Sequence, residues 1–322
     1  MSQHSDSDWL PTLLQRTGAT ALCRTETVQR LWKGHGQILR VSLSGGTVAS
    51  VIVKEIAPIA AGQDLGLQRK QHSYKVERAW YAHYSHLNGP DCRLPRCLAQ
   101  GSTASGDWLI LEGLDAAGYP QRRRQPDTAE TAAVLKWLAC FHARWLGTRA
   151  PALWTEGSYW HLATRPAEWQ ALPDSPLKTH AHEFDQCLKQ ARFQTLIHGD
   201  AKPANFCFGA SGVAAVDFQY VGHGPGVKDL VYFLSAIVPE EQAAQRLPTL
   251  RQHYFDQLSA ALSSRPDTDA DAAAIVAEWQ ALFAIAWLDY YRFERGWLGS
   301  GPAAYPYSEA CLQRFVTDYG AC

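Results

Sequence analysis

The sequence predicts an α+β protein with two lobes, a small β-rich N-terminal lobe with one main helix and a larger, mainly helical C-terminal lobe. The first third contains β-branched and apolar runs separated by glycine turns, a pattern typical of hairpins. Later segments carry apolar residues at helical spacing. A chain of 322 residues is long enough for two lobes that share a cleft. We expect the lobes to comprise residues 1–113 and 114–322, with a hinge near Glu112 and Gly113.

The predicted N-terminal lobe is a hairpin-rich sheet with a single helix. Strands are expected over the apolar runs 27–32, 37–43, 47–56 and 108–111. Residues 57–72 contain Pro58 and two glycines and are expected to form a loop. A helix is predicted over 73–87, because Val76, Trp80, Tyr84 and Leu87 fall on one helical face before the stop signal Asn88-Gly89-Pro90.

The predicted C-terminal lobe is mostly helical, with short strands around one hairpin. Asp127 and Glu130 form a capping pattern at the start of a helix that runs through Trp145. Further helices are expected over 177–192 and 271–295, the second with one broad apolar face. Short strands are expected over 193–197, 206–208 and 213–216. The stretch 147–176 is rich in proline and tryptophan and has no clear periodicity.

The composition excludes several classes of protein. With 46% hydrophobic and 19% charged residues, the chain predicts a sizeable core and not a disordered protein. The net charge is −1 and no long Lys/Arg run occurs, so no nucleic-acid partner is expected. Eight scattered cysteines without a C-x-x-C pair predict reduced thiols. We see neither a signal peptide nor about 18 consecutive apolar residues, and we expect a cytoplasmic protein without a membrane or obligate protein partner.

The most informative chemical signal is the segment 198–205, which reads HGDAKPAN. Asp200 and Asn205 lie between two apolar strands, and Asp217 ends the next strand twelve residues beyond Asn205. Phosphoryl transfer requires a metal to neutralise the γ-phosphate, and Mg²⁺ prefers oxygen ligands. We therefore predict that Asn205 and Asp217 bind Mg²⁺. Asp200 would take the proton of an acceptor hydroxyl as the catalytic base, and Lys202 would place positive charge near the γ-phosphate.

Residues in the N-terminal lobe complete this chemistry. Lys54 lies on an apolar strand, where an unpaired ammonium is costly, so phosphate oxygens and Glu77 are its expected partners. Gly34 and Gly36 lie between two strands, where a glycine turn lets backbone N–H groups approach phosphates. Each signal alone has another interpretation. Lys54 fits a surface lysine on an edge strand, the glycine turn fits a plain hairpin, and Glu77 fits a solvated helix residue. Their order relative to segment 198–217 favours the functional interpretation.

With these residues in order, the chain resembles the protein-kinase-like superfamily, and within it the aminoglycoside phosphotransferase and choline kinase group. The H-G-D-x-x-x-x-N block is that group's signature, whereas protein kinases carry H-R-D. The segments 216–222 (VDFQYVG) and 229–234 (DLVYFL) are most similar to the ecdysteroid-kinase-like branch. The resemblance covers about residues 25–300 and implies a two-lobed protein-kinase-like fold.

The resemblance also implies a role for each matching residue. Asp200 would be the catalytic base, and Asn205 and Asp217 would be the metal ligands. Lys54 and Glu77 would form the ion pair that positions the phosphates, and Glu112 to Leu114 would form the hinge that binds adenine. Asp229 and His198 would hold the catalytic loop in place. Asp229 has an alternative interpretation as a helix N-cap. Asp217 is followed by Phe218 and Gln219, without the glycine of protein kinases, so a protein-kinase-style switch at this loop is not expected.

The acceptor is the least defined part of the prediction. Asp289 and Tyr290 belong to an acidic and aromatic segment that would suit a cationic or amphipathic acceptor. The ecdysteroid-kinase-like resemblance instead points to a hydrophobic alcohol. We predict ATP- and Mg²⁺-dependent transfer of the γ-phosphate to a small-molecule hydroxyl. The alternative is a nucleotide-binding regulatory module without catalysis, which the incomplete glycine turn favours. The sequence leaves open whether ATP or GTP is the donor, and the oligomeric state.

Overall fold

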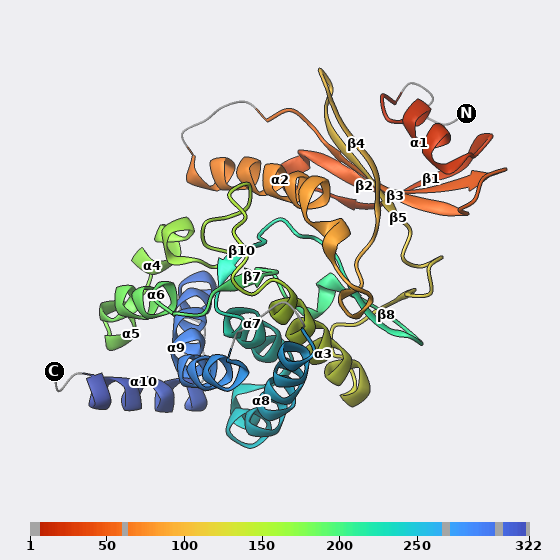
Figure 1. Cartoon of the computed structure of the whole chain (residues 1–322). Helices are drawn as coiled ribbons and strands as arrows, with labels where there is room; N and C mark the ends of the chain where they lie inside the picture. Colours follow the sequence, from red (N-terminus) through yellow and green to blue (C-terminus); the bar gives the residue numbers. More distant parts are fainter. Residues whose placement is uncertain (1–6, 60–63, 266–270, 300–304, 320–322) are drawn as a thin grey trace.

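The N-terminal lobe is an antiparallel five-stranded sheet in the order β1-β2-β3-β5-β4, seen in the computed structural model of Figure 1. The structure describes residues 7–59, 64–265, 271–299 and 305–319. The strands are β1 Ala21–Arg30, β2 Gly36–Ser44, β3 Ser50–Ile56, β4 Cys97–Thr103 and β5 Gly106–Glu112. The hairpin prediction is confirmed, although β1 begins earlier than expected and residues 32–34 form a short 3₁₀ turn.

Two elements of this lobe were not expected from the sequence. Strand β4 pairs along β5, but its side chains are mostly half-buried, so no clear alternation marks it. Helix α1, Leu10–Thr17, begins with a proline in its first turn and lies against the sheet. It brings Trp9 and Leu13 into a core with Val41, Val53 and Ile110. The lobe therefore has its own small hydrophobic core.

Helix α2, Leu65–His83, begins eight residues earlier than predicted. The Asp64 side chain accepts a hydrogen bond from Leu67 N at 2.7 Å and caps the helix. Residues 65–72 therefore continue the helix, and the predicted loop over 57–72 is wrong for this half. At the other end the helix stops at His83, and residues 85–87 form a 3₁₀ turn.

The C-terminal lobe is a helical bundle with small sheets at the face towards the N-terminal lobe (Figure 1). Its helices are α3 Thr128–Arg144, α4 Pro166–Gln170, α5 Pro176–Thr179, α6 Ala181–Lys189, α7 Val227–Ile237, α8 Glu240–Ser263, α9 Ala272–Leu298 and α10 Pro306–Tyr319. Its strands are β6 Gln121–Arg122, β7 Thr195–Ile197, β8 Phe206–Gly209, β9 Gly212–Ala215 and β10 Gly222–Gly224. β6, β8 and β9 form one sheet, and β7 pairs with β10 in another.

The helix predictions for this lobe are confirmed with one exception. The Asp127 side chain accepts from Glu130 N at 2.8 Å and Glu130 accepts from Asp127 N at 3.0 Å, which is the predicted capping box. The expected helix over 177–192 is two helices, because the chain breaks at His180 between α5 and α6.

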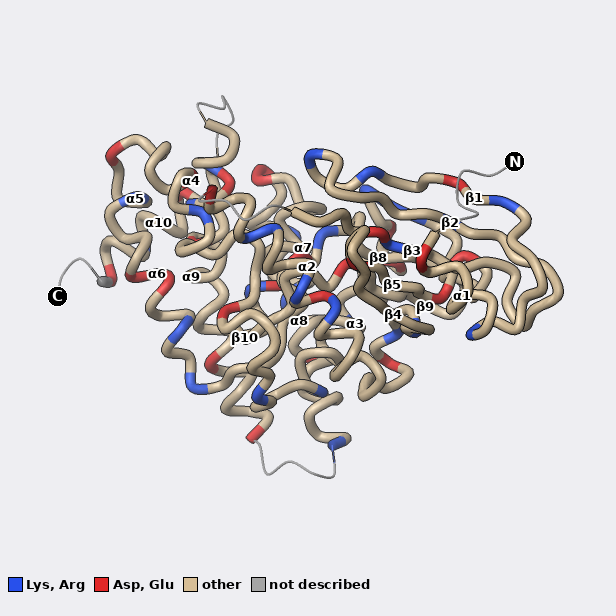
Figure 2. Tube along the Cα trace, turned by 90° about the horizontal axis from the view of Figure 1, so that it is seen from above, with Lys and Arg blue, Asp and Glu red and all other residues tan. Residues whose placement is uncertain are grey.

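Helix α9 is the central element of the bundle. By length and composition alone it is apolar enough to cross a membrane. In this structure, however, Ile275, Trp279 and Phe283 are fully buried in the lobe core, and α9 packs against α4, α6, α7 and α8. The core helix of a globular protein passes the same test, so length and composition are weak evidence here. Basic and acidic residues are interspersed along the traces of both lobes (Figure 2), as the net charge of −1 suggests.

The two lobes are joined by a shared core. Val76, Trp80 and Tyr81 of α2 pack with residues of α3 and of the segment after β9. The Trp80 ring stacks on Phe218 with 4.9 Å between centroids, and it meets Trp145 edge-on at 5.4 Å. Phe218 directly follows Asp217, so the packing of α2 also positions the predicted metal loop.

Candidate functional site

A cavity of about 840 Å³ lies between the lobes and brings together most of the predicted site residues. They come from β3, α2, the chain after β5, the segment after β7 and the segment after β9. The predicted residues that line it are Lys54, Glu77, Glu112, Leu114, Asp200, Lys202, Asn205 and Asp217. Residues more than 160 positions apart thus converge on one cleft, as expected for an active site between two lobes.

The segment after β7 is held in a shape that requires glycine at its second position. Gly199 has a φ of +79°, and a Cβ there would lie 2.1 Å from Tyr220 O. His198 Nε2 lies 3.0 Å from Val216 O, and its Nδ1 accepts a hydrogen bond from Asp200 N at 3.2 Å. The imidazole therefore connects the backbone before Asp217 to the backbone of Asp200.

Asp229 lies in the first turn of α7 and accepts hydrogen bonds from this same segment. Its carboxylate accepts from His198 N at 2.6 Å and from Gly199 N at 2.9 Å. His142 Nε2 lies 3.1 Å from the same carboxylate, and His142 Nδ1 lies 2.8 Å from the Tyr254 hydroxyl. The N-cap of α7 is Gly226, so the alternative interpretation of Asp229 as the N-cap does not hold.

The carboxylate of Asp200 is buried, and its neighbours include Lys202, Asn205 and the Tyr232 hydroxyl. Lys202 Nζ and Asn205 Nδ2 each donate to Asp200 Oδ2 at 2.9 Å. Oδ1 is buried, and no hydrogen-bond partner for it is found in the described part of the chain. Burial raises the pKa of Asp200 above its usual value, although Lys202 lowers it in part. A buried, polarised carboxylate oxygen without a partner is available to accept a proton from a bound molecule.

The cleft contains a buried ion pair between β3 and α2 of the N-terminal lobe, and Asp217 of the C-terminal lobe lies beside it. Lys54 Nζ lies 2.6 Å from Glu77 Oε2 and 3.3 Å from Asp217 Oδ1. Burial disfavours the ammonium, but Glu77 and Asp217 outweigh this effect and raise the pKa of Lys54. Burial also disfavours the Asp217 carboxylate, but Lys54, Lys70 and Lys202 together lower its pKa. Both groups therefore stay charged.

The residues around Asp217 fit a divalent cation. Asp217 adopts a φ of +68°, which is unusual for a residue other than glycine, and its side chain reaches the cavity while 37% exposed. Asn205 Nδ2 donates to both Asp200 O and Asp200 Oδ2, which leaves the amide oxygen of Asn205 for other contacts. A carboxylate and an amide oxygen facing one cleft are the kind of ligand that Mg²⁺ takes.

The predicted hinge lines the opposite end of the cavity. The Glu112 side chain pairs with Arg93 at 2.8 Å and Arg96 at 3.6 Å, and Glu112 N donates to Arg96 O at 2.9 Å. The Leu114 side chain is buried, and it packs with Tyr119 and Cys207. The Glu112 carboxylate is therefore paired with arginines. A nucleotide base at this end of the cavity would contact the backbone and the apolar side chain of Leu114.

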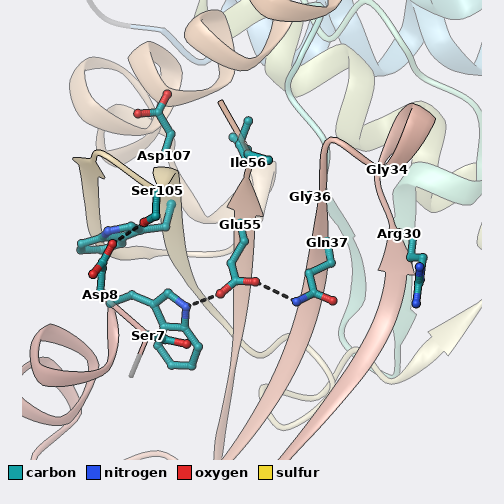
Figure 3. A pocket seen from close by; sticks show the side chains of 14 residues that line it. Ser7, Asp8, Arg30, Gly34, Gly36, Gln37, Glu55, Ile56, Ser105 and Asp107 are labelled. Atoms are coloured by element: carbon teal, nitrogen blue, oxygen red, sulfur yellow. Dashed lines mark hydrogen bonds between the residues drawn. The ribbon is translucent and has the colours of Figure 1, made fainter. Parts of the chain in front are cut away.

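Gly34 and Gly36 do not line the cleft. They lie at a second cavity of about 550 Å³ on the outer side of the sheet, shown in Figure 3. There Glu55 accepts hydrogen bonds from Trp9 Nε1 at 2.6 Å and from Gln37 Nε2 at 2.8 Å. A Cβ at Gly36 would lie 2.0 Å from Glu55 O, so close strand packing requires this glycine. The neighbouring residues Leu31 and Trp32 border the cleft, and Arg30 lines both cavities.

Asp289 and Tyr290 do not form the predicted acidic wall. Asp289 is 1% exposed, and its Oδ1 accepts from Arg292 Nη2 at 2.7 Å. Tyr290 packs on Trp160 and Tyr232, and neither Asp289 nor Tyr290 lines the cleft. The prediction is wrong because position 289 lies on the buried face of α9, where a carboxylate needs an internal partner.

Several residues of the cleft were not expected from the sequence. They are Arg69, Lys70, Tyr159, Arg165, Gln219 and Tyr220. Lys70 precedes Glu77 by two helical turns and would have been found if α2 had been extended to Leu65. Tyr159 and Arg165 lie in the stretch 147–176, whose irregular structure gives no periodic signal. Tyr232, which borders Asp200, has a pKa that burial and Asp200 raise well above its usual value.

Comparison with known families finds one match. Residues 63–263 match the family described as "Phosphotransferase enzyme family". This segment is more than half of the chain and contains α2, the hinge and all residues from His198 to Asp229 that were discussed above. No curated protein matches the sequence.

Three solved structures of similar shape are remote in sequence. A microcompartment-associated aminopropanol kinase has a TM-score of 0.53 at 16% identity, over 97% of this chain and 98% of that one. A putative fructosamine-3-kinase from Thermobifida fusca has a TM-score of 0.53 at 15% identity, over 97% of each chain. A choline kinase from Cryptosporidium parvum has a TM-score of 0.52 at 11% identity, over 92% of this chain and 89% of that one. These similarities confirm the kinase-like two-lobed fold.

Proposed function

The chain belongs to the phosphotransferase enzyme family, and on this basis we propose that it transfers the γ-phosphate of ATP, with Mg²⁺, to a hydroxyl group of a small molecule. The observation that carries the proposal is the buried Asp200 carboxylate, whose Oδ1 has no hydrogen bond of normal geometry among the described residues, in the same cavity as Asp217 and Lys54. A base for the hydroxyl, an anionic metal ligand and a cation for the phosphates then lie in one cleft.

The proposed reaction follows from the hydrogen bonds of Asp200. Lys202 and Asn205 hold Oδ2, which leaves Oδ1 as the oxygen that would accept the proton of the acceptor hydroxyl. The acceptor oxygen forms a bond to the γ-phosphorus as the bond from that phosphorus to the bridging β,γ-oxygen breaks, and ADP leaves. The proton passes from Asp200 to solvent after the phosphorylated product departs.

Charged residues of the chain would hold the nucleotide. Lys54, held by Glu77, would contact the α- and β-phosphates, and Lys202 would lie near the γ-phosphate. Asn205 and Asp217 would hold Mg²⁺, which when bound supplies charge neutralisation at the phosphates. Glu112 to Leu114 would meet the base through their backbone and the Leu114 side chain. His198 and Asp229 would hold the catalytic loop in place by the hydrogen bonds described above.

The ecdysteroid-kinase-like resemblance stays a prediction within this proposal. It implies an apolar alcohol, and the aromatic walls Tyr159 and Tyr220 of the cleft support an acceptor with an apolar body. The names of the similar structures include aminopropanol and choline kinases, which would imply an amino or ammonium alcohol.

Replacing Asp200 tests the proposal directly. Asp200→Asn keeps the shape and the hydrogen bonds near Asn205 but cannot accept the proton. We expect kcat for ADP release, measured with a broad panel of alcohols, to fall by about 10²- to 10⁴-fold. Nucleotide binding, measured as the Mg²⁺-dependent thermal shift with ATP, should persist. Asp174→Asn, at a fully exposed carboxylate, is the matched control and should leave kcat unchanged.

Two results would contradict the proposal in different ways. Equal rates in the wild type and Asp200→Asn would remove Asp200 from the reaction. A Mg²⁺-dependent thermal shift with ATP but no turnover of any acceptor would instead favour the nucleotide-binding regulatory module. The presence of Asp200, Asn205, Asp217 and Lys54 in one cavity supports the enzyme over the module.

A further inference from the structure

The part of the cleft next to Asp200 is walled by tyrosines and basic residues. Tyr159 N donates to Gly199 O at 2.9 Å, so this tyrosine lies directly beside the catalytic loop. The rings of Tyr159 and Tyr220 meet edge-on with 5.6 Å between centroids. Asp200 lies close enough to both to raise the pKa of each hydroxyl in addition to burial. An acceptor whose hydroxyl reaches Asp200 must therefore lie along these two rings.

Two arginines from different lobes meet at this wall. Arg165 Nε donates to Tyr159 O at 2.9 Å, and its guanidinium lies over the Tyr159 ring at 4.5 Å and the Trp297 ring at 5.3 Å. Arg69, on α2, donates through Nη1 to the backbone oxygen of Thr164 at 2.6 Å, and Thr164 directly precedes Arg165 in the chain. Both arginines line the cleft and both act on the Tyr220 hydroxyl, whose pKa they lower against the effect of burial.

Within the described residues, carboxylates balance only some of the basic side chains of this wall. Lys54 pairs with Glu77 and Lys202 pairs with Asp200. Arg165 has a single carboxylate contact, Glu168 at 3.2 Å. Within the described ranges no carboxylate lies within 4.0 Å of the Arg69 guanidinium or the Lys70 ammonium, and Arg69 Nε is buried without a hydrogen-bond partner.

A cationic acceptor would find no acidic receptor on this wall. The carboxylates that line the cavity are Glu77, Glu112, Asp115, Asp200 and Asp217. Glu112 and Asp115 pair with arginines at the hinge end, and Glu77 pairs with Lys54. Only the two carboxylates of the proposed chemistry remain. An ammonium group placed beside Arg69 and Arg165 would be repelled, whereas a carboxylate would gain charge-assisted hydrogen bonds.

We propose that the acceptor is an alcohol that carries a carboxylate, which Arg69 and Arg165 bind while the hydroxyl lies against Asp200 Oδ1. The inference rests on the proposed phosphotransferase function and names the acceptor class of the same site. An apolar or aromatic body between the two groups packs against Tyr159 and Tyr220. Lys70, which donates to Gln219 Oε1 at 2.5 Å, adds positive charge beside this position.

The test uses alcohols that differ only in charge. The matched set is para-(hydroxymethyl)benzoate, the corresponding benzamide and para-(aminomethyl)benzyl alcohol, within a wider panel of anionic, neutral and cationic alcohols. Kinase activity is measured as ADP release by the full chain with ATP and Mg²⁺. We expect the carboxylates to have the highest kcat/KM in each matched set, by about 10- to 100-fold over the amides.

Variants locate the origin of this preference. Arg69→Gln should raise KM for the preferred carboxylate by about 10- to 100-fold, leave KM for ATP unchanged and abolish the preference over the amide. Arg69→Lys should keep part of the preference for the carboxylate over the amide, because the positive charge is kept. Lys75→Gln removes an exposed cation from the same helix and should change nothing. Thermal unfolding of each variant checks that it is folded.

Each outcome supports or overturns the inference. Preference for the amine or the amide, or a panel in which only neutral or cationic alcohols react, would overturn it while leaving the phosphotransferase function intact. An Arg69→Gln variant whose KM rises for ATP and not for the carboxylate would assign Arg69 to the nucleotide and also overturn it. No ADP release that depends on Asp200 with any alcohol would contradict the proposed function itself.

Discussion

At the scale of single residues, the cleft depends on buried charges that are stable only in pairs. Lys54 is 4% exposed and Glu77 is 1% exposed, and they lie 2.6 Å apart. Burying either charge alone is costly, because the protein interior solvates ions poorly. Each of the two side chains therefore stabilises the charge of the other, and the effect of mutating one depends on whether the other is present.

This pairing predicts a strongly non-additive pair of mutations. Lys54→Met should lower the free energy of unfolding by about 3–5 kcal/mol, because it leaves the Glu77 carboxylate buried without its main partner. The double variant Lys54→Met/Glu77→Leu should recover most of that loss, since the buried Glu77 carboxylate is removed as well and Asp217, which also loses Lys54, is 37% exposed. Urea unfolding followed by circular dichroism measures both values. The exposed Lys75→Met is the control, and a double variant as unstable as the sum of the single variants would contradict the interpretation.

At the scale of elements, a second charge network connects the chain before α4 to α6 and α7. Glu156 Oε1 accepts from Lys228 Nζ of α7 at 3.0 Å, and Glu156 Oε2 contacts His161. Lys189 of α6 lies 3.3 Å from Glu156 and 2.7 Å from Asp185. Glu156, His161 and Asp185 cluster as metal ligands do, but the two lysines already neutralise the carboxylates. We interpret the cluster as an ion-pair network that holds these elements together.

This network predicts a specific loss of stability in acid. Burial would raise the pKa of Glu156, but Lys228 and His161 lower it from 4.5 to about 2. A carboxyl whose pKa is lower in the folded state stabilises the fold above its unfolded pKa, and this contribution is lost as the pH falls from 4.5 towards 2. At about 1.4 kcal/mol per pKa unit, the contribution near neutral pH is about 3 kcal/mol.

The Glu156→Gln variant checks this expectation. Its free energy of unfolding should lie below that of the wild type at about pH 6, and the difference should shrink as the pH falls to about 3. Glu183→Gln, which removes an exposed carboxylate from the same helix as Asp185, is the control and should show no such convergence. A difference that stays constant with pH would show that the Glu156 charge does not stabilise the fold.

At the scale of the whole molecule, α2 joins the lobes through both packing and polar contacts. Trp80 stacks on Phe218 in the shared core. Gln219 Oε1 accepts from Lys70 Nζ at 2.5 Å and from Ser73 Oγ at 3.3 Å. Gln219, at the position where protein kinases have a glycine, therefore connects the predicted metal loop to the N-terminal half of α2. The same contacts help to fix the position of Asp217 relative to Glu77.

Gln219→Gly should loosen this connection. Loss of the Gln219 side chain leaves Lys70 Nζ without this acceptor, whereas Ser73 Oγ keeps its hydrogen bond to Lys70 O at 2.8 Å. We expect amide hydrogen exchange over residues 65–74 to become about 10-fold faster. kcat should fall as well, because Asp217 and Glu77 lose a common support. Gln219→Glu keeps the acceptor and should keep the protection, which makes it the matched control. Equal exchange in Gln219→Gly and the wild type would show that packing alone holds α2.

Some of the fold and the site could be predicted because the signal is local. The capping box at Asp127, the apolar face of α9 and the glycine turns of the hairpins depend on residues close in sequence. The order of Asp200, Asn205 and Asp217 along the chain predicts a cleft, and the structure places all of them in it. The start of α2 was missed because Pro58 and two glycines outweighed the helix-favouring residues after Asp64.

The sequence by itself determined the two-lobed α+β architecture and the residue types for phosphoryl transfer, because both follow from periodicity and from short-range order. Only the tertiary structure decided which charged side chains line the cleft beside Asp200. Asp289 lies inside α9 against Arg292, whereas Arg69 and Arg165 come from opposite lobes to one wall. The burial of a side chain depends on elements that meet from distant parts of the chain. The charge of this wall of the cleft is therefore set by tertiary packing, which cannot be predicted from a local pattern of residues.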